Sequence, residues 1–125
     1  MEEQQEAFVA PLESVPKKAV EAGPGIFIQI LIGPDKAPNF AMRCFTIEPG
    51  SRIANHVNLV EHEQYVLEGR AEIGMGDKVH EVKQGDVVFI PAGVPHWYQT
   101  VGDVAFRFLC LVPNRQDTLT FIAGD

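Results

Sequence analysis

Residues 50–69 read GSRIANHVNLVEHEQYVLEG and contain His56 and His62, two of the four histidines in the protein. Residues two apart in a strand point to the same side, so His56 and Asn58 share a face and form a pair of candidate ligands. If residues 59–61 form a tight connection, the strand that returns from His62 brings that side chain beside the pair. Neutral imidazole is the commonest protein ligand for transition metals. The stretch therefore predicts adjacent strands that carry one side of a metal site.

A second stretch, residues 85–96, reads GDVVFIPAGVPH and ends on a further histidine, His96. Its segment 91–95 is too rich in proline and glycine to lie in the middle of a strand. We therefore expect His96 to enter the site from elsewhere in the sheet, at the start of a new strand. The prediction is that both stretches meet inside a small β-barrel, where His56, His62 and His96 hold a metal ion.

The composition predicts an all-β protein with a single domain. A chain of 125 residues has the usual length of one domain and can bury a core. Its 11 glycines and 9 prolines fall between short apolar runs, as in proteins built from many short strands joined by turns. The expected strands are 26–32, 40–48, 51–58, 62–68, 71–75, 78–82, 87–90, 96–100 and 104–112.

These strands predict a jelly-roll barrel over about residues 26–113. The run 26–32, IFIQILI, is almost continuously apolar, which predicts a strand that is buried on both faces. The N-terminal arm and the C-terminal tail are expected to pack outside the barrel. The tail carries one apolar patch, residues 119–122, which we expect on the barrel exterior.

The charge and the N-terminal sequence exclude several classes of partner. The formal net charge is −7, and no basic patch of the kind that binds nucleic acid is visible. The same acidic balance argues against binding to an anionic membrane surface. No apolar run approaches the roughly 18 residues of a membrane span. The start MEEQQEAFVAP lacks the basic-then-apolar order of a signal peptide, so we expect a cytoplasmic protein.

Both histidine stretches also resemble the sequence motifs of the cupin superfamily. The first cupin motif is G-x5-H-x-H-x3-(E, Q or H)-x6-G, and the second is G-x5-P-x-G-x2-H-x3-N. Every spacing fits, and the departures are Asn58, where the family usually has a second histidine, and Thr100, where it usually has asparagine. The matching positions are Gly50, His56, His62 and Gly69 in the first motif and Gly85, Pro91, Gly93 and His96 in the second.

Within cupins, the phrases LIGPDKAPNFAMRCFTIEPG, EHEQYVLEG and FRFLCLVP resemble the small bacterial single-domain manganese cupins, which have a four-histidine metal site. The resemblance implies the double-stranded β-helix or jelly-roll fold, a divalent transition metal as cofactor, and a homodimer. Manganese and iron are the metals expected first, and zinc, nickel and copper are alternatives. Because the cupin fold hosts many chemistries, the resemblance locates the site without naming its reaction.

Arg43 is unusual because it lies within an apolar run, 40–48, and arginine is rarely buried without a partner. Two interpretations stay open: an arginine on the polar outer face, or a pocket arginine that clamps a substrate carboxylate with two hydrogen bonds. The resemblance favours the second, because the matching arginine of the manganese cupins faces the site.

The pocket is expected to hold further side chains. Tyr98 shares a strand face with His96 and is a candidate to donate a hydrogen bond or a proton near the metal. Arg43 and Tyr98 are therefore the candidate catalytic residues. The expected substrate pocket consists of Arg43, Phe45, Phe108 and Cys110. For the two phenylalanines, packing in the core is the alternative.

The two cysteines are too few for a disulfide scaffold. If Arg43 and Phe45 point inward, alternation turns Cys44 to the opposite face. We therefore expect both thiols to be reduced. Cys44 fits a small buried hydrophobic residue, whereas the resemblance places Cys110 in the pocket.

Asn58 allows three interpretations. Its amide oxygen can coordinate the metal weakly, as a neutral and hard donor. It can instead hydrogen-bond a metal-bound water. As a third option, the loss of a histidine lowers metal affinity so far that the site is empty in the purified protein.

Three functions are compatible with this site. The first is a metal-dependent oxidoreductase, dioxygenase-like, that acts on a small organic molecule, because a site of neutral histidines keeps the full charge of the metal and favours anions, dioxygen or peroxide. The second is a metal-dependent isomerase or lyase that needs no oxygen. The third is a non-catalytic module that binds a small ligand.

Overall fold

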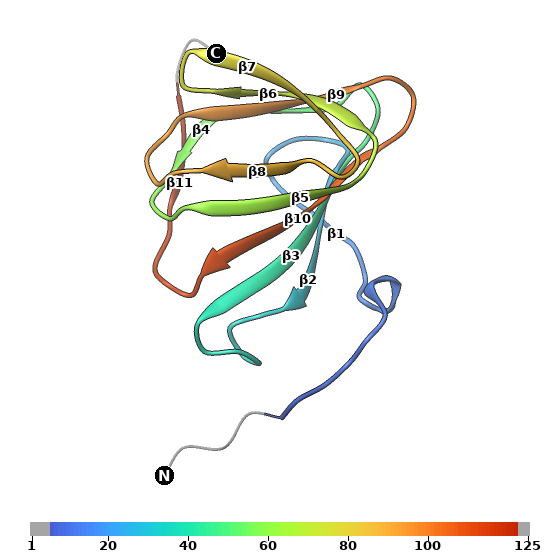
Figure 1. Ribbon diagram of the computed structural model, residues 1–125, viewed down its shortest axis with the longest axis vertical. Helices are drawn as coiled ribbons and strands as arrows, with labels where there is room; N and C mark the ends of the chain where they lie inside the picture. The colour runs from blue at the N-terminus through green and yellow to red at the C-terminus, as the bar shows by residue number, and fades with distance from the viewer. Residues whose placement is uncertain (1–5, 123–125) are drawn as a thin grey trace.

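The protein is a barrel of two antiparallel β-sheets that face each other (Figure 1). This computed structural model describes residues 6–122. The strands are β1 (Lys18–Ala19), β2 (Ile26–Ile32), β3 (Phe40–Ile47), β4 (Arg52–Asn58), β5 (His62–Glu68), β6 (Arg70–Met75), β7 (Lys78–Lys83), β8 (Val87–Ile90), β9 (His96–Val101), β10 (Phe106–Pro113) and β11 (Leu119–Phe121). A short 3-10 helix, η1 (Leu12–Ser14), precedes them.

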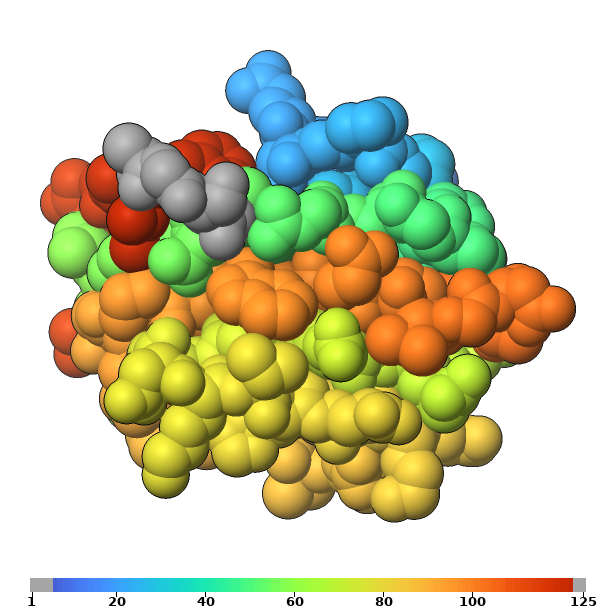
Figure 2. All heavy atoms as spheres, turned by 90° about the horizontal axis from the view of Figure 1, so that it is seen from above, coloured from blue at the N-terminus to red at the C-terminus, as the bar shows by residue number. Residues whose placement is uncertain are grey.

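One sheet has the strand order β1-β2-β3-β10-β5-β8 and the other the order β11-β4-β9-β6-β7. The all-β jelly-roll prediction is confirmed. Figure 2 views the outer face of the second sheet, where β9 in orange runs between β4 in green and the β6–β7 hairpin in yellow. No helix within residues 6–122 is long and apolar enough to cross a membrane.

Alternation along each strand separates the barrel interior from the surface. In β5, His62, Gln64 and Val66 are buried, whereas Glu63 and Tyr65 are exposed. The same period of two operates in the other core strands, because successive side chains of a strand point to opposite faces. The core includes Ile26, Ile47, Ile53, Ile73, Val88, Ile90, Phe106 and Phe108.

Glycine permits a tight connection at Gly69, between β5 and β6. Its φ of 81° lies in the left-handed region, which is strained for other residues. A Cβ atom here would also meet the carbonyl of Ala105. The glycine that ends the first motif therefore has a structural role in closing the barrel.

The prediction for β2 is correct in its bounds but wrong in its burial. Ile26 and Gln29 are each only 1% exposed, yet Ile30 is 46% exposed. Ile30 lies on the same face as the cavity-lining Ile28, and this face is only partly covered at Ile30. The opposite face is covered beside Gln29, where the N-terminal arm crosses it. Gln29 Nε2 donates to the carbonyl oxygen of Val15 at 2.8 Å and to that of Leu12 at 3.4 Å.

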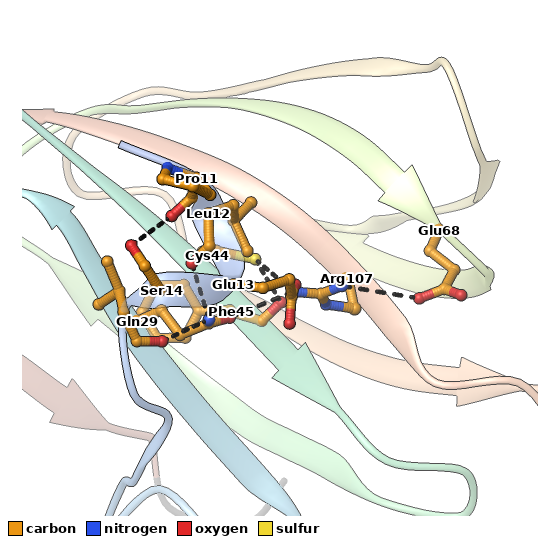
Figure 3. Close-up of polar contacts among 10 residues, drawn as sticks. Pro11, Leu12, Glu13, Ser14, Gln29, Cys44, Phe45, Glu68 and Arg107 are labelled. Carbon is orange, nitrogen blue, oxygen red and sulfur yellow. Dashed lines mark hydrogen bonds and ion pairs between the residues drawn. The ribbon is translucent and has the colours of Figure 1, made fainter. Parts of the chain in front are cut away.

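The N-terminal arm is held on the outside of the six-stranded sheet by Arg107 of β10 (Figure 3). Arg107 Nη2 donates to Glu13 Oε1 at 2.9 Å and to Gln29 Oε1 at 3.2 Å. Its Nη1 lies 4.0 Å from Glu68 Oε1. The Cys44 thiol is buried beneath this group, so it faces away from the interior, and both cysteines are free.

The C-terminal tail adds a strand to the edge of the barrel, and its Leu119 and Phe121 are 46% and 49% exposed. Residues 119–121 form β11, which pairs with β4 through Leu119 opposite Asn58 and Phe121 opposite His56. The side chains of Leu119 and Phe121 line the interior cavity. The apolar patch therefore extends the wall of the site, because β4 offers it a free edge to pair with.

Candidate functional site

The three candidate histidines gather in the barrel interior, although they come from both sheets. His56 of β4 and His96 at the start of β9 are register partners in one sheet. His62 begins β5 in the facing sheet. The ring centroids of His56 and His96 are 4.1 Å apart, and those of His62 and His96 are 5.8 Å apart. All three side chains are buried.

Each imidazole has its Nδ1 atom engaged by a neighbour. The Nδ1 atoms of His56 and His96 lie 2.8 Å and 2.9 Å from the carbonyl oxygen two residues earlier. A carbonyl only accepts, so these Nδ1 atoms carry the proton and Nε2 keeps its lone pair. His62 Nδ1 lies 3.5 Å from Cys110 Sγ. The Nε2 atoms of His62 and His96 are buried without a hydrogen-bond partner.

Burial keeps these imidazoles neutral. It lowers the pKa of His62 to about 3, with a further contribution from the positive charge of Arg43. It lowers the pKa of His96 to about 4, helped by His56, and it lowers the pKa of His56 as well. At neutral pH the rings are therefore in the unprotonated state that a metal ligand requires.

These donor atoms fit a divalent transition metal in kind, because neutral imidazole nitrogen suits such ions. The positions of the histidines show that further donor atoms are needed. Among residues 6–122, no three His, Cys, Asp or Glu side chains form a group that could hold an ion by themselves. Two amide oxygens in the same cavity, Asn58 Oδ1 and Gln64 Oε1, are buried without a hydrogen-bond partner. Oxygen donors are thus available to complete a site that the histidines alone leave open.

Asn58 is bound on one side by a carboxylate from the C-terminal tail. Its Nδ2 atom donates to Asp117 Oδ2 at 3.1 Å, and Asp117 Oδ1 accepts the backbone N–H of Leu59 at 2.7 Å. Asp117 also lines the cavity. The sequence interpretation did not include it.

Arg43 lies in the cavity and not on the outer surface. Its Nη2 atom donates to Cys110 Sγ at 3.3 Å, and its Cζ lies 5.1 Å from the centre of the Phe45 ring. Its Nε atom is buried without a partner. None of the ion pairs between described residues includes Arg43. A guanidinium in this state favours an anionic ligand, since no carboxylate of the cavity forms an ion pair with it.

A stack of aromatic rings forms one wall of the cavity. Phe108 lies 5.5 Å from Phe45 and 5.2 Å from Tyr98 between ring centroids, with planes 20° and 15° apart. Gln64 Nε2 donates to Tyr98 Oη at 2.7 Å. Burial raises the pKa of Tyr98, so the phenol stays protonated and can donate a hydrogen bond into the cavity.

The cavity has a volume of about 510 Å³, within the range of small-molecule sites. His56, His62, Arg43 and the aromatic stack line it. Two segments from the chain ends complete its wall: residues 20–22, which follow β1, and the β11 side chains Leu119 and Phe121. The Phe121 ring lies edge-on to His56, with centroids 6.0 Å apart.

Sequence reasoning missed Gln64 and Asp117. Gln64 lies two residues after His62, so strand alternation could have placed it on the same inward face. No local sequence pattern could have predicted Asp117 as a site residue, because its contact with Asn58 joins residues 59 positions apart.

The sequence profile of the Cupin_2 family, a cupin domain, matches residues 43–112, more than half of the chain. The chain therefore belongs to the cupin family. Protein SchB of Streptomyces halstedii is 30% identical over 109 residues, which cover 85% of this chain and 77% of SchB. The protein MJ1618 of Methanocaldococcus jannaschii is 36% identical over 62 residues, and the match spans 50% of its length.

Among solved structures, the chain is similar to the polyketide cyclase RemF from Streptomyces resistomycificus. The TM-score is 0.87 and the sequence identity 27%, with 96% of this chain and 88% of the RemF chain covered. A predicted oxalate decarboxylase of Thermotoga maritima superposes with a TM-score of 0.75 at 18% identity, over 85% of this chain and 98% of that chain, which shows the fold alone.

Proposed function

We propose that this cupin is a metal-dependent enzyme that catalyses a non-redox cyclisation of a planar, conjugated small molecule with an anionic group. The observation that carries this proposal is the arrangement of the cavity: a stack of three aromatic rings, Phe45, Phe108 and Tyr98, lies in the same pocket as the unpaired cation Arg43 and two neutral histidines. The third histidine, His96, packs against His56 behind this wall. The similarity to a polyketide cyclase over almost the whole chain supports the same class of substrate.

The residues can act as follows. The aromatic stack holds the flat part of the substrate by ring contacts. Arg43 pairs with a carboxylate or an enolate oxygen, so it orients the substrate and stabilises the charge of a carbon nucleophile. Tyr98 donates a hydrogen bond to the oxygen of the carbonyl that is attacked. A divalent metal on the histidines would polarise that carbonyl as a Lewis acid. Burial of His62, Gln64 and Tyr98 lowers the local dielectric constant, which strengthens these interactions.

In this reaction class a new carbon–carbon bond forms between an enolate carbon and a carbonyl carbon of the same molecule. The carbonyl oxygen takes up the proton that the nucleophilic carbon lost. Loss of water from the product then extends the conjugation. No electron acceptor is required.

We propose His56, His62, His96 and the Asn58 oxygen as the metal ligands, with manganese or iron as the ions to test first. For His62, His96 and Asn58 the support is a buried donor atom without a hydrogen-bond partner. For His56 it is the position of the ring, 4.1 Å from that of His96 between centroids. The two buried free thiols suit a reducing compartment, which supports the cytoplasmic location expected from the sequence.

A dioxygenase is the second candidate function. No carboxylate stands at the four ligand positions, so a bound metal would keep its full charge, which favours dioxygen or an anionic co-substrate. Glu61 and Glu63, which flank His62, are both exposed.

The test separates these two candidates. Protein loaded with Mn²⁺ or Fe²⁺ is incubated with linear 1,3-diketones that end in a carboxylate, with and without oxygen, and products are identified by mass spectrometry. We expect dehydrated cyclic products to form at the same rate under argon as in air.

Arg43→Met should reduce kcat/KM by at least about 100-fold, because the charge-assisted contact with the substrate is lost. Arg70→Met, which removes a surface cation, should leave it unchanged. Turnover that consumes oxygen stoichiometrically contradicts the proposal and favours the dioxygenase.

A further inference from the structure

We infer that Asp117 is a positioning residue: it fixes the Asn58 side chain so that the amide oxygen faces the histidines and serves as a fourth donor. This inference rests on the proposed metal site and assigns a role to a residue of the C-terminal tail. It also explains how an asparagine can stand at a position where the family usually has a histidine.

The first argument is the chemistry of the hydrogen bond. The oxygen and nitrogen ends of a side-chain amide are nearly identical in size and shape. The hydrogen-bond partner therefore determines which end is the oxygen and which is the NH₂ group. Here the neighbour is a carboxylate, and an ionised carboxylate only accepts. The end of Asn58 that lies 3.1 Å from Asp117 Oδ2 is therefore the NH₂ group. The oxygen points the other way, where it is buried without a partner.

The second argument is that the carboxylate is itself held in place. Asp117 Oδ1 accepts the N–H of Leu59 at 2.7 Å, so both oxygens of the carboxylate are engaged by adjacent residues of the 58–59 corner. Two residues later, Leu119 is the β11 partner of Asn58. Upstream, Asn114 Nδ2 donates to the carbonyl oxygen of Ala37 at 2.7 Å. The tail is thus anchored on both sides of Asp117.

The third argument concerns the donor strength of the amide. A carboxylate that accepts from the NH₂ group draws positive charge to that end and leaves the oxygen more negative, as a carboxylate does for a metal-bound histidine. Asp117 therefore makes the weak donor Asn58 a stronger one. Because both oxygens of the acid are engaged by residues 58 and 59, the proposed donor set would stay neutral.

The decisive variant is Asp117→Asn. Its oxygen can still accept the Leu59 N–H, so the new NH₂ group would face the NH₂ group of Asn58. The Asn58 amide is then expected to turn over and present its NH₂ group to the histidines. We expect the affinity for Mn²⁺ alone, titrated by calorimetry, to fall about 10- to 100-fold. Glu61→Gln is the matched control, because it removes an exposed carboxylate near the same corner and should leave the affinity unchanged.

A second measurement needs no metal. In ¹⁵N-labelled apoprotein, the Asn58 NH₂ signals should show the downfield shift of a donor to a carboxylate, and this shift should vanish in Asp117→Asn and return in Asp117→Glu. Equal Mn²⁺ affinities of wild type and Asp117→Asn, or NH₂ signals that do not change between them, would overturn the inference. Because the signals are recorded in apoprotein, they test the amide orientation even if the proposed reaction is wrong.

Discussion

At the scale of single residues, burial holds the three imidazoles neutral, and this has a consequence for stability. An unfolded chain binds protons at these histidines near pH 6.5, whereas folding lowers the pKa of His62 to about 3 and that of His96 to about 4. The free energy of unfolding of the apoprotein should therefore be highest above pH 6.5 and fall as pH is lowered toward 4. The loss is about 1.4 kcal/mol per pH unit for each such group.

Urea unfolding at several pH values measures this slope. His62→Asn removes one of the titrating groups, so its slope between pH 6.5 and 4 should be shallower than that of the wild type. His80→Asn, which removes an exposed histidine, is the control and should keep the wild-type slope. Equal slopes for wild type and His62→Asn would show that the buried ring takes up its proton in the folded state as easily as in water.

Those residues of the site that belong to a short sequence motif could be predicted from the sequence. The spacing of His56, His62 and His96 predicted candidate ligands, and the structure brings these three side chains together. The state of Asn58 was left open because an amide can play several roles at that position. The contact with Asp117 shows which end of the amide is the NH₂ group, and it was invisible in the sequence because only the folded tail brings Asp117 to Asn58.

At the scale of elements, the β6–β9 pair depends on a glycine beneath an indole ring. Gly74 and Trp97 are register partners on adjacent strands, and a Cβ atom on Gly74 would overlap the indole of Trp97. Gly74→Ala should therefore lower the free energy of unfolding by about 1–3 kcal/mol through overpacking. Chemical denaturation measures the effect. The same substitution in a Trp97→Leu background should cost clearly less, and an equal loss in both backgrounds would contradict this explanation.

Most strands could be predicted to within a residue or two, because alternation and glycine turns are local features. β2, β5 and β8 have the predicted bounds. β11 was not predicted as a strand, since an apolar patch of a few residues becomes a strand only by pairing with β4. The exposure of Ile30 was missed for a related reason: an apolar run does not reveal how much of a sheet face other elements cover.

At the scale of the whole molecule, we propose a homodimer, as the resemblance implies. The six-stranded sheet ends at β8, whose outward residues Val87 and Phe89 are 78% and 55% exposed, beside the exposed Tyr65 of β5. Val9 of the N-terminal arm, which lies near β2 and β3 of the same sheet, is fully exposed. Exposed apolar surface on this scale is typical of an interface between subunits.

Sedimentation equilibrium tests this proposal. The wild-type protein should have about twice the chain mass of 13.8 kDa, and Val87→Lys with Phe89→Lys should shift it to the monomer. Val79→Lys places the same charge on β7 of the other sheet, where the side chain is also exposed, and should leave the dimer intact. A monomeric wild type, or dissociation by Val79→Lys alone, would contradict the proposed interface.

The topology of the two sheets could not be derived from alternation alone, because period-two patterns give strands and not their order. The motif resemblance supplied the fold, and the family match and the structure confirm it. What the resemblance could not supply is the reaction, which depends on the contents of the cavity.

The central claim is that His56, His62 and His96, with the oxygen of Asn58, bind one divalent metal inside the barrel. The most direct test is elemental analysis of protein purified without added metal and again after incubation with Mn²⁺ or Fe²⁺ and gel filtration. We predict about one ion per chain in the wild type and none in His96→Ala, with unchanged circular dichroism. A wild type that retains no ion under either condition, or a His96→Ala variant that retains as much as the wild type, would contradict it.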